Sequence, residues 1–395
     1  MRKQFPIFDH HPELIYLDSA ATAHKPRCVI DALTQFYSSE YATVHRSIYR
    51  SSLLATEKYN ATRETAQKFL NALHTDEIVF TRGTTDAINL VAASYGKTHL
   101  KPNDEILISP MEHHSNIVPW QMLAQQTGAQ LRYIPMNSQG VLEWHASITP
   151  RTKIIALAHI SNVTGTINPI HQIARAAHAN NAILLVDGAQ AAPHMPIDVQ
   201  ALDCDFYAFS GHKCYGPTGV GVLYGKKHLL NSMPPIQGGG DMIERVDLLT
   251  TTYQKPPLRF EAGTPLIGPV IALKAALDFI TQMGRPQISA HTQTLLLHAT
   301  NRLQSIPNLK IIGTAPDKGP ILTFTIASIH PLDIATLLDL KNIAIRSGHL
   351  CAQPLLRAFQ LTSAARASFA LYNTLEEVDL FANALESLIP QLIKS

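Results

Sequence analysis

Short apolar segments alternate with helical patterns over residues 26–230, and this alternation constrains the fold more than any other feature of the chain. The expected helices are Pro26–Glu40, Ser51–Ala72, Thr84–Tyr95, Asn116–Gln126 and Ile170–Asn180. The expected strands are Ile78–Phe80, Glu105–Ser109, Gln130–Ile134, Ile154–Ala158, Ile183–Val186, Asp205–Phe209 and Gly219–Tyr224. Strands that alternate with helices form βαβ units, in which a parallel sheet is covered by helices on both faces. The sequence therefore predicts an α/β fold with a mostly parallel, seven-stranded sheet.

A second block of elements follows a segment rich in proline and glycine at 234–240, which predicts a loop. Its expected helices are Val270–Gln282, Ala290–Leu303, Leu332–Leu340 and one that starts at Leu375, and its expected strands are Leu309–Ile312, Ile321–Ile326, Ile343–Arg346 and Arg366–Leu371. A chain of 395 residues is too long for one simple core. We expect a large domain over residues 15–263 and a smaller α/β C-terminal domain over residues 264–395, to which residues 1–14 also belong.

The composition argues against several classes of protein. A hydrophobic content of 46% with 16% charged residues is typical of a well-buried globular enzyme. A net charge of +2 without a run of basic residues argues against nucleic-acid binding. The most apolar segment, 265–280, is interrupted by Lys274 and Asp278, so we expect no membrane span. No signal peptide is evident, and the four cysteines form no CxxC pair, which indicates a reduced, cytoplasmic protein.

An acid and a lysine follow two of the apolar segments. Asp187 ends the run 183–186, and Lys213 comes shortly after the run 206–209. Because parallel strands end at the same edge of a sheet, both side chains would enter one pocket. A lysine for a Schiff base and an acid that keeps a ring nitrogen protonated are what pyridoxal phosphate requires, and Gln190 could donate to the ring hydroxyl. Taken alone, an acid at a strand end more often caps a turn, so that alternative stays open.

Other residues fit the same cofactor. Thr84 and Thr85 open a helix, where backbone N–H groups and hydroxyls can hold a phosphate, and Ser210 and His212 could add contacts to it. His113 follows a strand, where an imidazole can stack on the cofactor ring and exchange protons. Adjacent histidines do not share a face of a helix or strand, and no second ligand cluster follows at metal-binding spacing, so we expect no metal site.

Cys351 differs from the other three cysteines in its surroundings. It follows Gly348 on a loop, with Arg346 and other basic residues close in sequence, and positive neighbours favour the nucleophilic thiolate. Arg366 begins a strand just downstream, where its guanidinium could hold a substrate carboxylate at two points; a surface salt bridge is the alternative. We expect structural roles for the remaining cysteines, which are Cys28, Cys204 and Cys214.

Taken together, the motifs resemble those of the cysteine desulfurases, in particular the SUF-type branch. They lie in order along nearly the whole chain, at 17–22, 44–46, 81–85, 111–120, 187–190, 210–213, 260–265 and 346–351. The resemblance implies a fold-type I pyridoxal-phosphate-dependent transferase that forms a homodimer with active sites at the subunit interface. It also implies L-cysteine as substrate, although the branch includes cysteine sulfinate desulfinase and selenocysteine lyase activities, and sequence does not rank these substrates.

The resemblance also implies a role for each matching residue. Lys213 would form the Schiff base and remove the α-proton, and Cys351 would accept sulfur as a persulfide while L-alanine is released. The implied cofactor-binding residues are Thr84, Thr85, His113, Asp187, Gln190, Ser210, His212 and, from the other subunit, Thr264. The implied substrate-binding residues are Asn162, Arg346, Arg366 and, from a segment that reaches toward the neighbouring site, His45 and Arg46.

The sulfur would pass from Cys351 to an acceptor protein of the SUF/CSD type, with iron–sulfur cluster assembly as the usual destination in the family. Three alternatives remain. A selenocysteine lyase would release selenium without needing an enzyme thiol. An aminotransferase or epimerase of the same fold would have no use for Cys351. A non-catalytic scaffold would bind the sulfur-transfer partner without the cofactor, and the retained Lys213, Asp187 and Cys351 speak against it.

Overall fold

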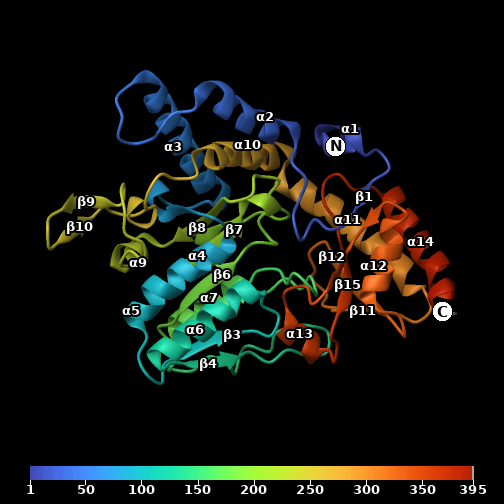
Figure 1. Cartoon of the computed structure of the whole chain (residues 1–395). Coiled ribbons are helices and arrows are strands. Elements are labelled where there is room, and N and C mark those ends of the chain that lie inside the picture. The colour runs from blue at the N-terminus through green and yellow to red at the C-terminus, as the bar shows by residue number, and fades with distance from the viewer. Residues whose placement is uncertain (394–395) are drawn as a thin grey trace.

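The computed structural model describes residues 1–393, and a seven-stranded sheet forms the centre of its larger part (Figure 1). In spatial order the strands are β2 (Ile78–Thr81), β8 (Gly221–Gly225), β7 (Phe206–Ser210), β6 (Ile183–Asp187), β5 (Thr152–Ala158), β3 (Glu105–Ile108) and β4 (Gln130–Tyr133). Strand β8 is antiparallel to both of its neighbours, and the remaining pairs are parallel. The prediction of a mostly parallel seven-stranded sheet is confirmed.

Both faces of this sheet are buried, because successive side chains of each strand pack against different helices. On β3, Ile106 and Ile108 belong to a cluster that includes α4 (Thr84–Val91) and α6 (Val118–Thr127). Leu107 belongs to the cluster on the other face, which includes α3 (Arg50–Leu70), α7 (Ile170–Ala179) and α10 (Ile267–Met283). Apolar runs without alternation therefore become central strands.

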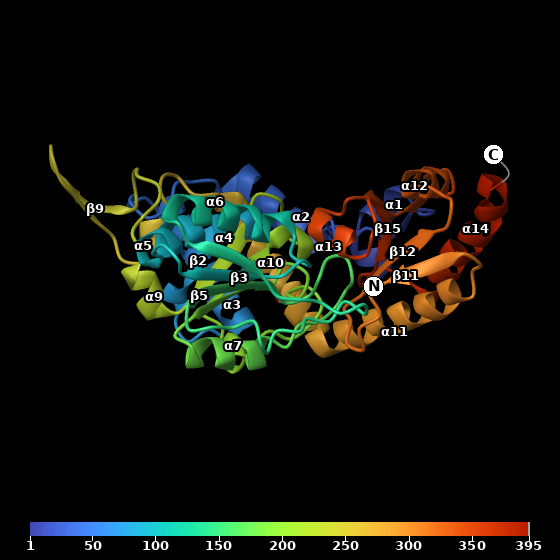
Figure 2. The ribbon, with the colours of Figure 1, turned by 90° about the horizontal axis from the view of Figure 1, so that it is seen from below.

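The smaller part of the molecule lies beside the larger one (Figure 2). Its antiparallel sheet has the order β11 (Leu309–Ile312), β12 (Ile321–Ile326), β15 (Ala364–Ser368) and β14 (Arg346–Gly348). It packs with α11 (Arg285–Gln304), α12 (Pro331–Asp339) and α14 (Leu375–Ile393). The division at residues 263 and 264 stays a prediction, and the last two residues of the predicted domain, 394 and 395, lie outside the described residues.

The N-terminal segment packs against this smaller part. Strand β1 (Ile15–Tyr16) pairs in parallel with β13 (Ile343–Ala344), and Arg2 forms an ion pair with Glu377. The preceding α1 spans Ile7–His10, and the chain then crosses to the larger part through α2 (Arg27–Gln35). The segment between β1 and α2 thus runs along the junction of the two parts.

The helices expected over 26–40 and 84–95 are confirmed: each begins as an α-helix, to Gln35 and Val91, and continues as a π-helical turn to Glu40 and Gly96. Other predicted boundaries were wrong. The helix expected to start at Asn116 begins at Val118, after a 3-10 turn. The strand expected over 343–346 divides into β13 and β14, which pair with different partners. The strand expected to start at Arg366 starts two residues earlier and ends at Ser368.

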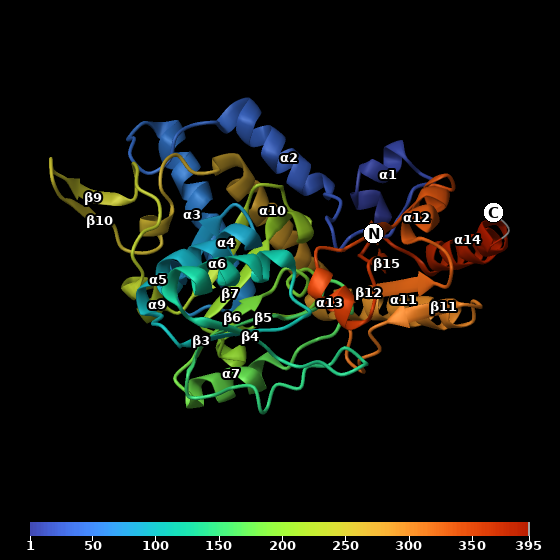
Figure 3. The ribbon, with the colours of Figure 1, turned by 60° about the horizontal axis from the view of Figure 1, so that its bottom comes forward.

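The segment after the proline- and glycine-rich loop forms a hairpin that the sequence did not predict. Its strands are β9 (Ile243–Val246) and β10 (Thr251–Tyr253), and it projects away from the rest of the chain (Figure 3). Its tip exposes Leu248 and Leu249 almost completely. The remaining helices are short: α5 (Lys97–His99), α8 (Val199–Leu202), α9 (Lys227–Ser232) and α13 (Gln353–Ala358).

Candidate active site

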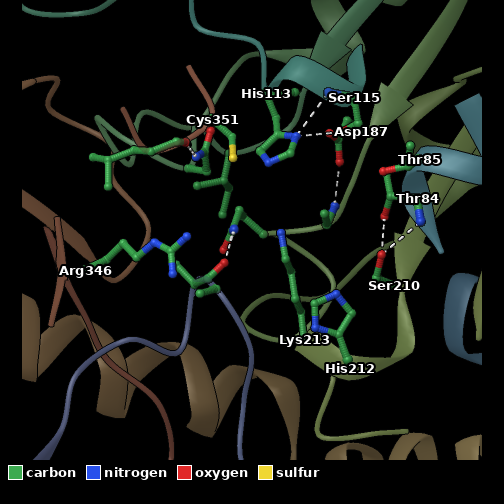
Figure 4. Close-up of a pocket in the computed structure, with 18 of the residues that line it drawn as sticks. Thr84, Thr85, His113, Ser115, Asp187, Ser210, His212, Lys213, Arg346 and Cys351 are labelled. Carbon is green, nitrogen blue, oxygen red and sulfur yellow. Dashed lines mark hydrogen bonds between the residues drawn. The ribbon is translucent and has the colours of Figure 1, made fainter. Parts of the chain in front are cut away.

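A pocket of about 280 Å³ lies at the carboxyl ends of the parallel strands, between the two parts of the molecule (Figure 4). It brings together most of the predicted site residues: Thr84, Thr85, His113, Asn162, Asp187, Gln190, Ser210, His212, Lys213, Arg346, Cys351 and Arg366. The strands β6 and β7 end at this pocket, as expected for neighbouring parallel strands, while Arg346 and Arg366 come from the smaller sheet.

Asp187 and Lys213 face this pocket from neighbouring strand ends. The carboxylate of Asp187 is buried and accepts one hydrogen bond, from Ala189 N–H to Oδ1 at 2.9 Å, and burial raises its pKa. Lys213 ends a 3-10 turn that follows β7. Its amine lies deep enough that desolvation lowers its pKa, although the charge of Asp187 acts in the opposite direction. A lysine with a lowered pKa is more readily the neutral nucleophile and base.

His113 lies on the loop after β3, on the other side of the pocket from Lys213 (Figure 4). Ser115 was not predicted, yet it fixes this ring: its backbone N–H donates to His113 Nδ1 at 3.1 Å, and its Oγ lies 2.7 Å from the same nitrogen. Because Nδ1 accepts a hydrogen bond, the ring proton belongs on Nε2. Burial, followed by the charge of Lys213, lowers the pKa of His113 to about 3, so the ring is neutral near pH 7.

The hydroxyls of Thr84 and Ser210 lie at one end of the pocket, where α4 begins after Gly83. Gly83 has a φ of +152° and a ψ of 179°, a region open essentially to glycine alone. This geometry turns the chain so that Thr84 N–H donates to Ser210 Oγ at 2.9 Å, and the two hydroxyl oxygens lie 2.8 Å apart. The start of α4 with Thr84, Thr85 and Ser210 therefore offers the donors that an anion such as phosphate needs.

The opposite end of the pocket is cationic. Arg366 Nη2 donates to Asp18 Oδ1 at 3.0 Å and Nη1 donates to Asn162 O at 2.9 Å, but its Nε is buried without a partner. The Asn162 side chain donates to Leu350 O at 2.7 Å, and its Oδ1 also has no partner. Arg346 lies directly opposite Arg366 in the β14–β15 register. Two opposed guanidinium groups and an orphaned N–H suit an anionic ligand such as a carboxylate.

Cys351 is exposed, on the loop between β14 and α13. Both Cys351 and Leu350 have positive φ angles, +53° and +52°. The sulfur lies on the side of the pocket that also carries His113 (Figure 4). Cys204 and Cys214 are buried, as expected of structural cysteines, but Cys28 is exposed on α2.

Three predicted residues are absent from this pocket. His45 packs edge-on against the ring of Tyr59, Arg46 forms an ion pair with Asp241 at 2.7 Å, and Thr264 lines a separate cavity. The prediction for these three involves a neighbouring subunit, so a single chain does not test it.

The sequence predicted no individual roles for residues 18–22, of which Ala20 and Ala21 line the pocket. Asp18 holds Arg366, Ala20 O accepts from Gln190 Nε2 at 2.8 Å, and Thr22 Oγ1 lies 3.1 Å from His212 Nδ1. The run of small residues at 19–21 is the available signal, because small side chains allow close approach of two backbones. Within residues 1–393, no three His, Cys, Asp or Glu side chains gather as metal ligands would.

The aminotransferase class-V family matches this chain over residues 15–381. The chain belongs to that family. Among its relatives, a probable cysteine desulfurase of Halalkalibacterium halodurans is 50% identical over 98% of this chain and 96% of its own length. A cysteine desulfurase of Klebsiella pneumoniae is 48% identical over 98% of this chain and 97% of its own length. The resemblance predicted from the motifs is thus confirmed.

Two solved structures show the same class-V fold. The cysteine desulfurase CsdA (S-sulfonic acid) from Escherichia coli is 44% identical, with a TM-score of 0.93 over 99% of this chain and 98% of that one. The apo cysteine desulfurase from Thermococcus onnurineus NA1 is 37% identical, with a TM-score of 0.95 over 99% and 97%. The predicted fold-type I architecture is therefore confirmed.

Proposed function

We propose that this chain is a cysteine desulfurase, which converts L-cysteine to L-alanine and takes up the sulfur as a persulfide on Cys351. The observation that carries the proposal is that Lys213, Asp187 and Cys351 line one pocket in a class-V chain 48–50% identical to cysteine desulfurases over nearly its full length.

Pyridoxal phosphate is the cofactor that this pocket fits. The buried Asp187 carboxylate has only one hydrogen bond and suits a cationic ring N–H, which would offset the cost of its burial. Thr84, Thr85 and Ser210 surround the start of α4 and would hold the phosphate. When bound, the cofactor supplies an electron sink for the substrate carbon. His212 and Gln190 line the same cavity and would complete its binding.

The cationic end of the pocket would bind the substrate carboxylate. The unpartnered Nε of Arg366 supplies a donor in a buried position, and Arg346 supplies a second guanidinium on the adjacent strand. This contact fixes the substrate so that its α-carbon lies toward Lys213. The lowered pKa of Lys213 suits it to take the α-proton, and the neutral His113 carries a proton on Nε2 that it can share.

The sulfur step needs a thiolate that can reach the substrate. Cys351 Sγ attacks the substrate sulfur, an S–S bond forms, and the Cβ–Sγ bond of the substrate breaks with its electron pair left on carbon. The carbon then takes up a proton and becomes the methyl group of alanine, so one sulfur atom is transferred overall. The exposed position of Cys351 also allows an acceptor protein to collect that sulfur afterwards.

The biological unit that we propose is a homodimer. His45, Arg46 and Thr264 lie outside the pocket of their own chain, consistent with a contribution to a second copy's site. Ile48, Tyr49, Leu53 and Leu54, which follow His45 and Arg46 in the chain, have exposed apolar side chains, as do Leu248 and Leu249 at the tip of the β9–β10 hairpin. A second copy would remove these side chains from water.

The sulfur acceptor that we propose is a protein of the SUF/CSD type, and the destination of the sulfur is iron–sulfur cluster assembly. The compartment that we propose is the cytoplasm, where the free cysteines would stay reduced. Selenocysteine and cysteine sulfinate are further candidate substrates. No helix among residues 1–393 combines the length and apolarity that a membrane crossing needs.

Mass spectrometry after incubation with cysteine tests the proposal. We expect one additional sulfur atom on Cys351, alanine as product, and no sulfide release from the Cys351→Ser variant. The Cys28→Ser variant, which changes another exposed cysteine, is the matched control and should keep full activity. If Cys351→Ser desulfurates cysteine at the wild-type rate, the assignment of the nucleophile is wrong. Activity of that variant on selenocysteine alone would indicate a selenocysteine lyase.

A further inference from the structure

The turn that carries Cys351 adopts backbone angles that its own residues do not favour. Ala352 N–H donates to His349 O at 3.0 Å, which closes a four-residue turn with Leu350 and Cys351 at its centre. Both central residues have positive φ, the pattern of a type I′ turn, which normally takes Asn-Gly. A β-carbon is disfavoured at such angles, so contacts from elsewhere in the chain must hold this turn.

Two segments of the larger part supply those contacts. His114 N–H donates to Cys351 O at 2.8 Å, and Asn162 Nδ2 donates to Leu350 O at 2.7 Å. The side chain of Leu350 is 6% exposed and packs in the main core. The carbonyls of Leu350 and Cys351 are therefore both held by the active-site region, since Asn162 lines the pocket and His114 adjoins His113.

The ring of His114 makes a further contact on the far side of Cys351. Its Nε2 accepts a hydrogen bond from Gln353 N–H at 3.2 Å, at the first residue of α13. That N–H has no partner within the helix, so the imidazole caps it. Burial, followed by the charge of His349, lowers the pKa of His114, which keeps Nε2 free to accept. His114 thus contacts the loop twice: its backbone N–H binds Cys351 O, and its ring binds Gln353 N–H.

We propose that His114 is a positioning residue for Cys351, which fixes the turn in the conformation that directs the thiol into the pocket. This inference rests on the proposed function, because it concerns the reach of the sulfur acceptor. The two adjacent histidines then have different roles. His113 faces the cofactor pocket, and His114 holds the loop that carries Cys351.

The test compares His114→Ala and His114→Phe, which lack the ring acceptor, with His114→Gln, whose amide oxygen can accept from Gln353 N–H. Phenylalanine also keeps the volume of the ring, so one acceptor-free variant should fold even if alanine leaves a damaging gap. His171→Ala, at an exposed histidine on α7, is the matched control. The holoenzyme is assayed for kcat and KM with cysteine, for its cofactor absorption band, and for amide hydrogen exchange.

We expect the acceptor-free variants to lower kcat about tenfold, the effect of one lost hydrogen bond, with KM and the absorption band unchanged. Amides of residues 350–356 should exchange about tenfold faster, whereas those of β6 should not change. His114→Gln should restore both toward wild type. Wild-type exchange in the acceptor-free variants, or a glutamine variant no better than alanine, would overturn the inference. Failure of the wild-type enzyme to desulfurate cysteine would instead refute the proposed function. The comparison of amide hydrogen exchange would still test whether His114 holds the turn at Cys351.

Discussion

Replacing Glu112 by glutamine should make the stability of the protein less sensitive to rising pH. Glu112 is completely buried on the loop that carries His113, where Oε2 accepts from Asn116 Nδ2 at 2.6 Å and Oε1 accepts from Ser109 Oγ. Burial raises its pKa from 4.5 to about 8. A glutamine amide can accept from Asn116 through its oxygen and donate to Ser109 Oγ through its nitrogen, but it has no proton to lose.

The size and sign of the effect follow from proton linkage. The folded state holds the Glu112 proton more tightly than the unfolded state, so this group's stabilisation is fully present below pH 4.5 and is lost as pH rises through about 8. With 1.36 kcal/mol for each pKa unit, the loss between pH 5.5 and pH 8 amounts to about 3 kcal/mol. Wild type should lose that much stability relative to Glu112→Gln over this interval.

Urea denaturation of both proteins at pH 5.5 and pH 8, followed by circular dichroism, measures this difference. Glu105→Gln is the matched control on the same segment. Burial alone would raise the pKa of Glu105, but hydrogen bonds from Thr149 and Arg132 outweigh it and lower the pKa. That substitution should therefore destabilise the protein at neutral pH and lose its effect in acid. Parallel pH slopes for wild type and Glu112→Gln would refute the assignment of a protonated Glu112.

Three further predictions concern the two ends of the pocket and the buried ion pair between Arg63 and Glu261. Gly83→Ala should lower the free energy of unfolding by about 1–3 kcal/mol, because its backbone angles exclude a β-carbon; an unchanged denaturation midpoint would contradict this. Arg366→Lys should raise KM for cysteine about tenfold or more, while Arg357→Lys on the exposed side of α13 should leave it unchanged. Glu261→Gln should destabilise by about 3–5 kcal/mol in thermal or urea unfolding, since it leaves the buried Arg63, paired at 2.8 Å, without its counter-charge; a loss below 1 kcal/mol would count against a buried pair.

Local patterns were enough to find the strands and the chemistry at their ends. The apolar runs 154–158 and 183–186 became central strands, because side chains on both faces of such a strand pack against helices and no polar face remains. Asp187 and Lys213 follow apolar runs of neighbouring strands, so the sequence alone predicts that they converge. The change from α-helix to π-helical turn after Gln35 and Val91 was less predictable, since the residues that follow, Phe36 and Ala92, are neither proline nor glycine.

Residues far apart in the chain decided the rest of the site. Nothing near Asp18 in sequence indicates that it holds Arg366, and Leu-Cys at 350–351 is a poor sequence for a turn with two positive φ angles.

The sequence by itself determined the α/β class with its mostly parallel sheet and the groups that can perform the chemistry, because both depend on hydrophobic period and on residues next to strand ends. Only the tertiary structure decided how Cys351 is presented and which groups are neutral. A strained turn is stable only where distant donors such as His114 hold it, and the pKa of His113 or Glu112 depends on the water that packing removes.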